Sequence, residues 1–183
     1  MPPSRRDQIL DTAATLFAER GFHGVSVHDI GGACGISGPA LYKHFAGKDD
    51  VLAQSLTSIS ERLLAEGRAR SHAAATPDEA LTALIDWHIE FALGHPALIV
   101  VQEREWTNLA AEGRRAVRAL QLSYIDIWVD TLRRLRSDLD PAEARAAVQA
   151  TFGLLNSTPH SARISAAQMR SRLSRMARAA LLA

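Results

Sequence analysis

The spacing of the apolar residues is the feature that most constrains how this chain folds. In almost every long segment they recur at positions i, i+3 and i+4, and no run alternates with the period of two that a half-buried strand requires. Typical helix starts stand between these stripes, namely Ser26 as an N-cap and the pairs Thr76-Pro77 and Asp140-Pro141. We therefore predict an all-α fold.

The same pattern predicts about nine helices. Gly21 and Gly35 stand where the first two should end, because glycine readily adopts the left-handed conformation of a helix C-cap. The expected helices span residues 4–20, 26–34, 37–45, 48–70, 77–94, 97–109, 112–136, 141–156 and 162–183. Residues 157–160, Ser-Thr-Pro-His, are expected to connect the last two helices.

Composition limits the class of protein. A chain of 183 residues with 47% hydrophobic residues can bury a real core. Cys34 is the only cysteine and no zinc-like Cys/His spacing is present, so we expect neither a disulfide nor a metal or other cofactor. The N-terminal MPPSRRDQIL lacks the apolar region of a signal peptide, and the longest apolar run, 97–101, is too short to span a bilayer. We expect a cytoplasmic protein that does not bind membranes.

The segment 34–50, CGISGPALYKHFAGKDD, predicts a short helix with a slim first turn. Ser37 is placed to cap it, while Gly38 and Pro39 occupy positions where the missing proline donor is harmless. A helix tip with so few side chains fits into the major groove of DNA. Together with the helix at residues 26–34, it predicts a helix-turn-helix.

The exposed face of this short helix carries groups that can donate to phosphate oxygens. Leu41 and Phe45 are four residues apart and are expected to point inward as its anchor. The donors are then Tyr42, Lys43, His44 and, at the start of the next helix, Lys48. Residues 1–50 hold five basic and six acidic residues, so any DNA binding depends on local placement rather than on net charge.

Residues 5–56 resemble the DNA-binding domain of the TetR family of bacterial transcriptional regulators, over ILDTAATLFAERGFHGVSVHDIGGACGISGPALYKHFAGKDDVL. The resemblance implies a helix-turn-helix domain at 1–47 and a helical effector-binding and dimerisation domain at 48–183. It also implies a repressor that binds palindromic double-stranded DNA as a homodimer and is released by a small molecule. Base contacts are expected from Gly38, Pro39, Ala40 and Lys43, and phosphate contacts from Ser26, Ser37, Tyr42, His44 and Lys48.

The last two expected helices are the natural dimer interface, because both carry apolar stripes rich in small residues. The residues expected there are Val148, Phe152, Leu155, Met169, Leu173 and Met176. The last helix region also holds five arginines and no acid. We expect these arginines to pair with Asp138, Asp140 or Glu143 at a solvated rim, with a site for an anionic ligand as the alternative.

The middle helices are expected to bind the effector, because polar residues interrupt their apolar stripes and they hold all three tryptophans. The expected pocket residues are Trp87, His88, Phe91, Trp106, Gln121, Tyr124, Trp128 and Asn156. Taken singly, each of them also fits a purely structural core position. The segment FALGHPALIVVQEREWTNL is similar to TetR-type regulators of actinobacteria, some of which sense acyl-CoA thioesters. We expect a lipophilic effector, with an acyl-CoA as one candidate.

Two other classes of function, an enzyme and a protein-binding adaptor, compete with this interpretation. An enzyme is not expected, and no catalytic residue is assigned, because residues 35–39 match the G-x-S-x-G pattern only superficially and no other catalytic motif is present. The alternative is a helical protein-binding adaptor whose helix-turn-helix-like tip does not bind DNA specifically. The pair Gly31-Gly32 and the acidic balance of residues 1–50 favour the adaptor. A steep fall of affinity with salt would favour DNA.

Overall fold

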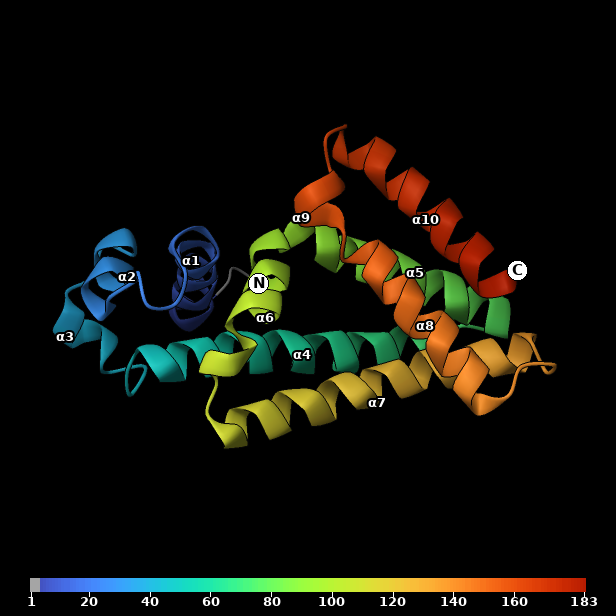
Figure 1. Cartoon of the computed structure of the whole chain (residues 1–183), viewed down its shortest axis with the longest axis horizontal. Coiled ribbons are helices and arrows are strands. Elements are labelled where there is room, and N and C mark those ends of the chain that lie inside the picture. Colours follow the sequence, from blue (N-terminus) through green and yellow to red (C-terminus); the bar gives the residue numbers. More distant parts are fainter. Residues whose placement is uncertain (1–3) are drawn as a thin grey trace. The chain divides into compact units, whose positions relative to one another are not determined.

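A computed structural model describes residues 4–183, and in that range the chain is helical without any strand (Figure 1). The predicted all-α class is confirmed. The helices in chain order are α1 (Arg5–Arg20), α2 (Val27–Ala33), α3 (Gly38–Leu41), α4 (Lys48–Ala73), α5 (Pro77–Gly94), α6 (Pro96–Glu105), the 3-10 helix η1 (Trp106–Asn108), α7 (Ala111–Leu135), α8 (Pro141–Leu155), α9 (Thr158–Ser161) and α10 (Ala166–Leu182).

Local capping explains where several helices begin. The side chain of Ser26 accepts from the backbone N–H of Asp29, whose carboxylate accepts in turn from the N–H of Ser26. Asp140 forms the same reciprocal arrangement at the start of α8, and Thr76 caps α5. These three starts confirm the sequence prediction.

Three segments differ from the prediction. The short helix predicted over residues 37–45 ends at Leu41 and is followed by turns. The helix expected to reach residue 109 ends at Glu105 and continues as η1. Residues 158–161, which were expected to connect two helices, form α9. The hydroxyl of Thr158 donates to the carbonyl of Ala92 at 2.7 Å, which fixes this extra turn. Consequently α10 begins only at Ala166, after its cap Ser165.

The chain divides into two compact units that are each made of two stretches of sequence. The first comprises residues up to Ile59 together with Ala97–Arg118. Its buried core joins the N-terminal helices to Val101, Leu109 and Val117 of the later stretch. The N-terminal helices therefore share their core with α6 and with the beginning of α7.

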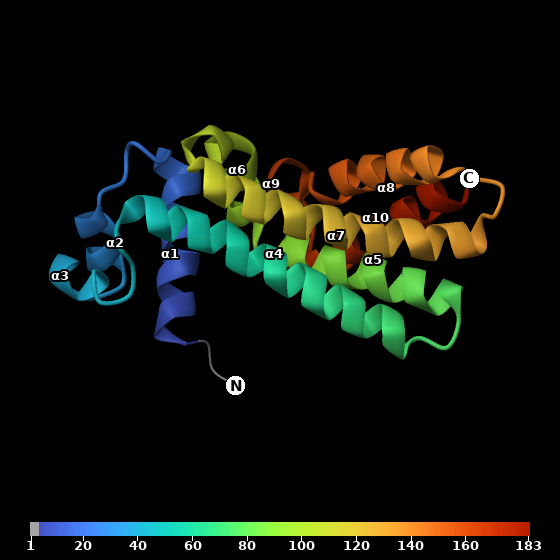
Figure 2. The same cartoon turned by 90° about the horizontal axis from the view of Figure 1, so that it is seen from below.

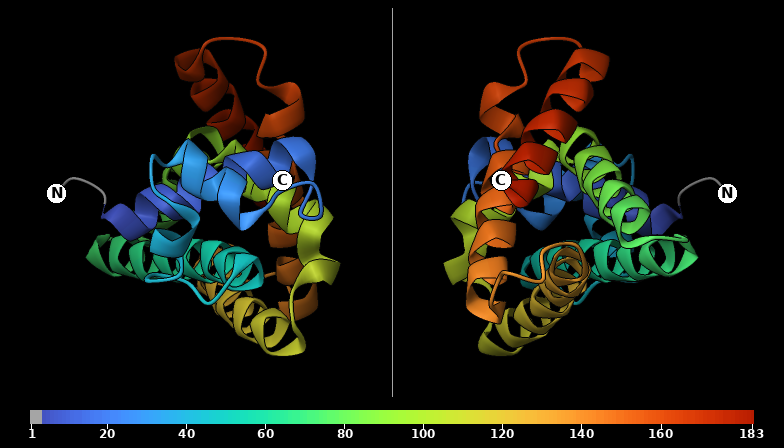
Figure 3. Two further views of the ribbon diagram at one scale, coloured as in Figure 1. Left: turned by 90° about the vertical axis from the view of Figure 1, so that its left-hand side faces the viewer. Right: turned by 90° about the vertical axis from the view of Figure 1, so that its right-hand side faces the viewer.

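The second unit comprises Ser60–Pro96 and Ala119–Ala183. Within it, the later part of α4 runs beside α7, and Gly67 of α4 faces the ring of Tyr124 (Figure 2). The last helix, α10, packs against both α5 and α8 (Figure 3). Trp128 is fully buried in the core that these helices enclose.

Candidate nucleic-acid interface and effector site

The turn between α2 and α3 fixes the predicted reading helix. Gly35 adopts a φ of 66°, a left-handed conformation that glycine enters at little cost. The N–H of Ile36 donates to the carbonyl of Gly31 at 2.9 Å and closes the turn. Leu41 and Phe45 are buried in the core of the first unit, so they anchor the short helix as predicted.

The side chains predicted to contact DNA lie on the surface around α3, with one exception. Tyr42 is 57% exposed, and the others that are exposed are Ser26, Ser37, Pro39, Lys43 and His44. Ala40 is half-buried, and Gly38 opens the helix. These residues lie in and directly around α3, apart from Ser26, which caps α2, and their contacts with DNA stay a prediction.

Lys48 is the exception, because its ammonium group is already bound within the protein. Its Nζ donates to the carbonyl of Phe22 at 2.9 Å and lies 4.3 Å from the centre of the Phe22 ring. Lys48 therefore holds the segment that follows α1. A phosphate contact would have to share this ammonium group or replace its bond to Phe22.

Arg5 and Arg6, which the sequence suggested as flanking one groove of DNA, tie α1 to the helix-turn-helix. Arg6 donates to the carbonyl of His44 at 3.3 Å, and its guanidinium lies 5.0 Å from the centre of the Phe45 ring. Arg5 donates to the carbonyl of Cys34. Helix periodicity carries no signal for such contacts, which join residues about thirty or more positions apart.

An aromatic cluster in the second unit brings together five of the predicted pocket residues. His88 lies at its centre, with the Phe152 ring centroid at 4.5 Å and that of Tyr124 at 5.9 Å. Trp128 and Phe91 meet His88 edge-on, at 6.0 and 5.7 Å. The fifth residue, Asn156, has its Oδ1 3.0 Å from His88 Nε2. Phe152, which was expected at the dimer interface, belongs to this cluster.

The other three predicted pocket residues lie outside the cluster. The indole N–H of Trp87 donates to the carbonyl of Leu63 at 3.3 Å, and the guanidinium groups of Arg62 and Arg70 lie over its ring. Gln121 is half-buried on α7. Trp106 belongs to η1 in the first unit and packs against the core of the N-terminal helices.

Burial keeps the titratable members of the cluster uncharged. It lowers the pKa of His88 to about 4, although the hydrogen bond with Asn156 acts in the opposite direction. Burial also raises the pKa of the Tyr124 phenol, against smaller opposing effects of Trp128 and Arg70. Four buried polar atoms have no partner of normal hydrogen-bond geometry: His88 Nδ1, Tyr124 OH, Trp128 Nε1 and Thr151 Oγ1.

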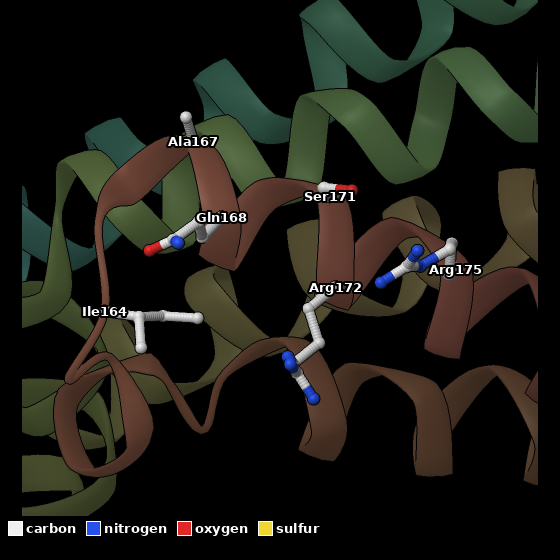
Figure 4. Close-up of a pocket in the computed structure, with 6 residues that line it drawn as sticks. All are labelled: Ile164, Ala167, Gln168, Ser171, Arg172 and Arg175. Atoms are coloured by element: carbon white, nitrogen blue, oxygen red, sulfur yellow. The ribbon is translucent and has the colours of Figure 1, made fainter.

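The residues predicted for the dimer interface divide into two sets. Val148, Leu155, Met169 and Leu173 are buried inside the single chain, because α10 packs on α5 and α8. Met176 is 46% exposed, and Phe152 is half-buried. Met176 lines a groove of about 330 Å³ with residues of α8 and α9, and a second groove of about 420 Å³ follows the outer face of α10 (Figure 4).

Arg178 of α10 does not pair with Asp138, Asp140 or Glu143, the pairing that was expected of the arginines in this region. Arg178 instead pairs with Asp78 of α5, because α10 packs along that helix. Asp138 pairs with Arg136 at 2.8 Å, which lowers the pKa of its carboxyl, and the other two acids cap α8. Arg172 and Arg175 line the groove in Figure 4, whose six lining residues include no acid.

Residues 4–183 hold neither a cluster of metal-binding side chains nor a single helix that could span a membrane. No group of three or more His, Cys, Asp or Glu side chains in that range is placed to hold a metal ion. No single described helix is long and apolar enough to cross a membrane; α5 and Pro96–Asn108 reach that length and composition only as a pair bent by 82°.

Comparison with known proteins matches both parts of the chain. Residues 9–54 match the bacterial regulatory proteins of the tetR family, and residues 74–160 match the tetracyclin repressor-like C-terminal domain. The HTH-type transcriptional repressor KstR2 of Mycobacterium tuberculosis is 33% identical over 151 residues, which cover 75% of this chain and 72% of the repressor. The fatty acid metabolism regulator protein of Bacillus subtilis is 25% identical over 157 residues, with 82% and 79% covered.

Solved structures extend this similarity to the fold. A TetR-family transcriptional regulator from Bordetella parapertussis superposes with a TM-score of 0.82 at 27% identity, covering 94% of this chain and 93% of the other. The structure of the ketosteroid transcriptional regulator KstR2 superposes with a TM-score of 0.78 at 26% identity, covering 97% of this chain and 94% of the other. These matches indicate DNA-binding regulators and no catalytic family. The chain therefore belongs to the TetR family of bacterial transcriptional regulators, as its helix-turn-helix predicted.

Proposed function

We propose that this protein is a repressor that binds a palindromic operator as a homodimer and is released by a small lipophilic effector. The carrying observation is the α3 tip, where Tyr42, Lys43 and His44 are exposed around a helix that Leu41 and Phe45 anchor. An anchored helix with an exposed polar face is what direct reading of the major groove requires.

The proposed contacts follow from the placement of the side chains. Gly38, Pro39 and Ala40 offer few hydrogen-bonding groups, so base reading depends on Lys43, on apolar contacts with thymine methyl groups and on DNA shape. Phosphate contacts come from Tyr42 and His44 and from the hydroxyls of Ser26 and Ser37. Lys48 adds a phosphate contact if its ammonium group also keeps its hydrogen bond to the carbonyl of Phe22.

Selection of bound fragments from random duplex DNA tests this proposal. Tyr42→Ala is the test variant, and Leu122→Ala, which removes a side chain that is 41% exposed on α7, is the matched control. We expect a palindromic site from the original protein and from the control, lost with Tyr42→Ala, with affinity that falls steeply with salt. A folded protein that enriches no site at low salt would favour the adaptor.

The homodimer is proposed to form through the outer faces of α8 and α10. Ile164 is 45% exposed and Met176 46%, and both line the groove of about 330 Å³ beside α9. A two-fold contact between identical faces would pair two reading helices, as a palindromic operator requires. Sedimentation of an Ile164→Glu, Met176→Glu variant should show a monomer, whereas Leu122→Glu should leave the dimer intact.

The aromatic cluster around His88 is proposed as the effector site. Sites for small molecules are largely apolar with a few polar groups, which describes this cluster. One relative is named a ketosteroid transcriptional regulator and another a fatty acid metabolism regulator protein, which supports a lipophilic effector, and an acyl-CoA remains a candidate. Operator affinity should be measured with steroids, fatty acids and acyl-CoAs. If some of them bind while none changes operator affinity, the coupling proposal fails.

A further inference from the structure

We propose that the buried end of the effector is an uncharged flat ring bearing a keto or hydroxyl group, recognised by the polar atoms that the aromatic cluster leaves without partners. This inference rests on the proposed function, because it names the chemistry of the same site. Its carrying observation is the set of four buried atoms without a partner of normal hydrogen-bond geometry: His88 Nδ1, Tyr124 OH, Trp128 Nε1 and Thr151 Oγ1. Trp128 acts on the pKa of the Tyr124 phenol as a hydrogen-bond partner, so these two atoms lie near each other, but neither is fully satisfied. Buried polar atoms are nearly always paired, so several in one core indicate a missing partner.

The ring geometry favours a flat ligand. The ring of His88 is nearly parallel to those of Tyr124, at 9°, and Phe152, at 26°. Trp128 closes one side edge-on, at 84° to both Tyr124 and Phe152. Offset stacking and edge-to-face contact are the two arrangements that aromatic rings prefer. A flat ligand ring that takes a place in this cluster would therefore make both kinds of contact.

The unpartnered atoms define which polar groups the ring should carry. When the Nε2–H of His88 donates to Asn156 Oδ1, Nδ1 is left as an acceptor. The indole N–H of Trp128 only donates, whereas the hydroxyls of Tyr124 and Thr151 can do either. A ligand keto group can accept from Trp128 or Tyr124, and a ligand hydroxyl can donate to His88.

The surrounding charges exclude a carboxylate or an ammonium group at this end. A buried charge needs an opposite charge, and none of the residues that form the cluster carries one at neutral pH. Arg70 is the cation that acts on Tyr124, but it already pairs with Glu66 at 3.6 Å and with Glu90 at 3.4 Å. An anionic effector would place only its uncharged part here.

Gly67 provides a steric test of the same site. A Cβ built on Gly67 would lie 2.5 Å from Cε2 of Tyr124 and 3.5 Å from Cδ2 of Leu84. The 2.5 Å contact requires something to move, and the Tyr124 ring already packs against His88 and Trp128. The change Gly67→Ala should therefore displace the Tyr124 ring and disturb the proposed site.

Matched naphthalene probes test the inference on the full chain by quenching of tryptophan fluorescence. The probes are 2-naphthol, 2-acetylnaphthalene, naphthalene and 2-naphthoate, which share one ring system and differ in polarity and charge. We expect the first two to bind about tenfold more tightly than the last two, because they alone satisfy the buried atoms without adding a charge.

Three variants locate the binding. Thr151→Val should weaken the binding of 2-naphthol about fivefold and leave the binding of naphthalene unchanged. Trp128→Phe also removes part of the ring that lines the site, so it should weaken the binding of both probes, that of 2-naphthol more than that of naphthalene. Gly67→Ala should weaken all the probes, and Leu122→Ala should weaken none. Circular dichroism melting of each variant checks that it is folded.

Three results would overturn the inference: equal binding of 2-naphthoate and 2-naphthol, selectivity that survives both polar variants, or no binding of any probe. The proposed repressor function fails separately. If the probes bind with the expected selectivity while no ligand changes operator affinity, the chemistry of the site stands and the regulatory coupling does not.

Discussion

Acidification below neutral pH should destabilise this protein through His88. The pKa of His88 falls from an ordinary 6.5 to about 4 because the ring is buried without a counter-charge. Between pH 4 and pH 6.5 the unfolded chain binds a proton at this histidine, whereas the native ring stays neutral. Stability contributed by the neutral ring is therefore complete above pH 6.5 and is lost as pH falls toward 4.

The magnitude follows from the same two values. A tenfold change in proton affinity is about 1.4 kcal/mol, so the full effect is about 3 kcal/mol. Over the range from pH 7.5 to pH 5 the expected loss is about 2 kcal/mol, because the native ring is still mostly neutral at pH 5. That is a large share of the stability of an ordinary domain.

Urea unfolding at fixed protein concentration, followed by tryptophan fluorescence at pH 7.5 and pH 5, measures this loss. His88→Phe keeps a ring in the stack but cannot bind a proton. Its loss of stability between the two pH values should be smaller by about 2 kcal/mol than that of the original protein. His72→Gln, at an exposed position, is the control. Equal losses for His88→Phe and the original protein would refute the reasoning.

Five further substitutions have expected outcomes. Thr151→Val should raise the free energy of unfolding by about 1 kcal/mol in urea titrations, because it removes a buried hydroxyl that has no partner. Gly32→Ala should also stabilise by about 1 kcal/mol, because a Cβ there meets nothing within 4 Å, whereas Gly67→Ala should destabilise despite the same gain in helix propensity. Lys48→Ala should lower both the melting temperature and operator affinity, since it removes the bond to Phe22; Tyr42→Ala should lower operator affinity alone.

Most of the fold was predictable from sequence patterns that involve residues close together in the chain. Ser26, Thr76 and Asp140 cap helices as expected, because a cap depends on residues within one turn of it. The anchor Leu41 and Phe45 was predictable for the same reason. The turn Thr158–Ser161 was missed because a hydroxyl bond to Ala92, in a distant part of the chain, supports it.

The candidate sites were less predictable wherever long-range packing decides the outcome. Apolar stripes on α8 and α10 looked like a dimer interface, yet Val148 and Leu173 pack inside one chain. A stripe shows that a face is buried and does not show what buries it. Likewise, periodicity could not place Trp106 in a different unit from Trp128. His88 and Asn156 were recognisable as polar interruptions of apolar stripes, although not as a hydrogen-bonded pair.

The shared core of the first unit has a consequence for protein engineering. Val101, Leu109 and Val117 pack in one cluster with the helices that carry the reading surface. A fragment cut after residue 47 would expose that cluster to water and should aggregate or unfold. A hybrid regulator with a new operator specificity should therefore be made by exchanging only residues on the surface of α3. Joining the N-terminal helices of another protein to this chain would disrupt the shared core.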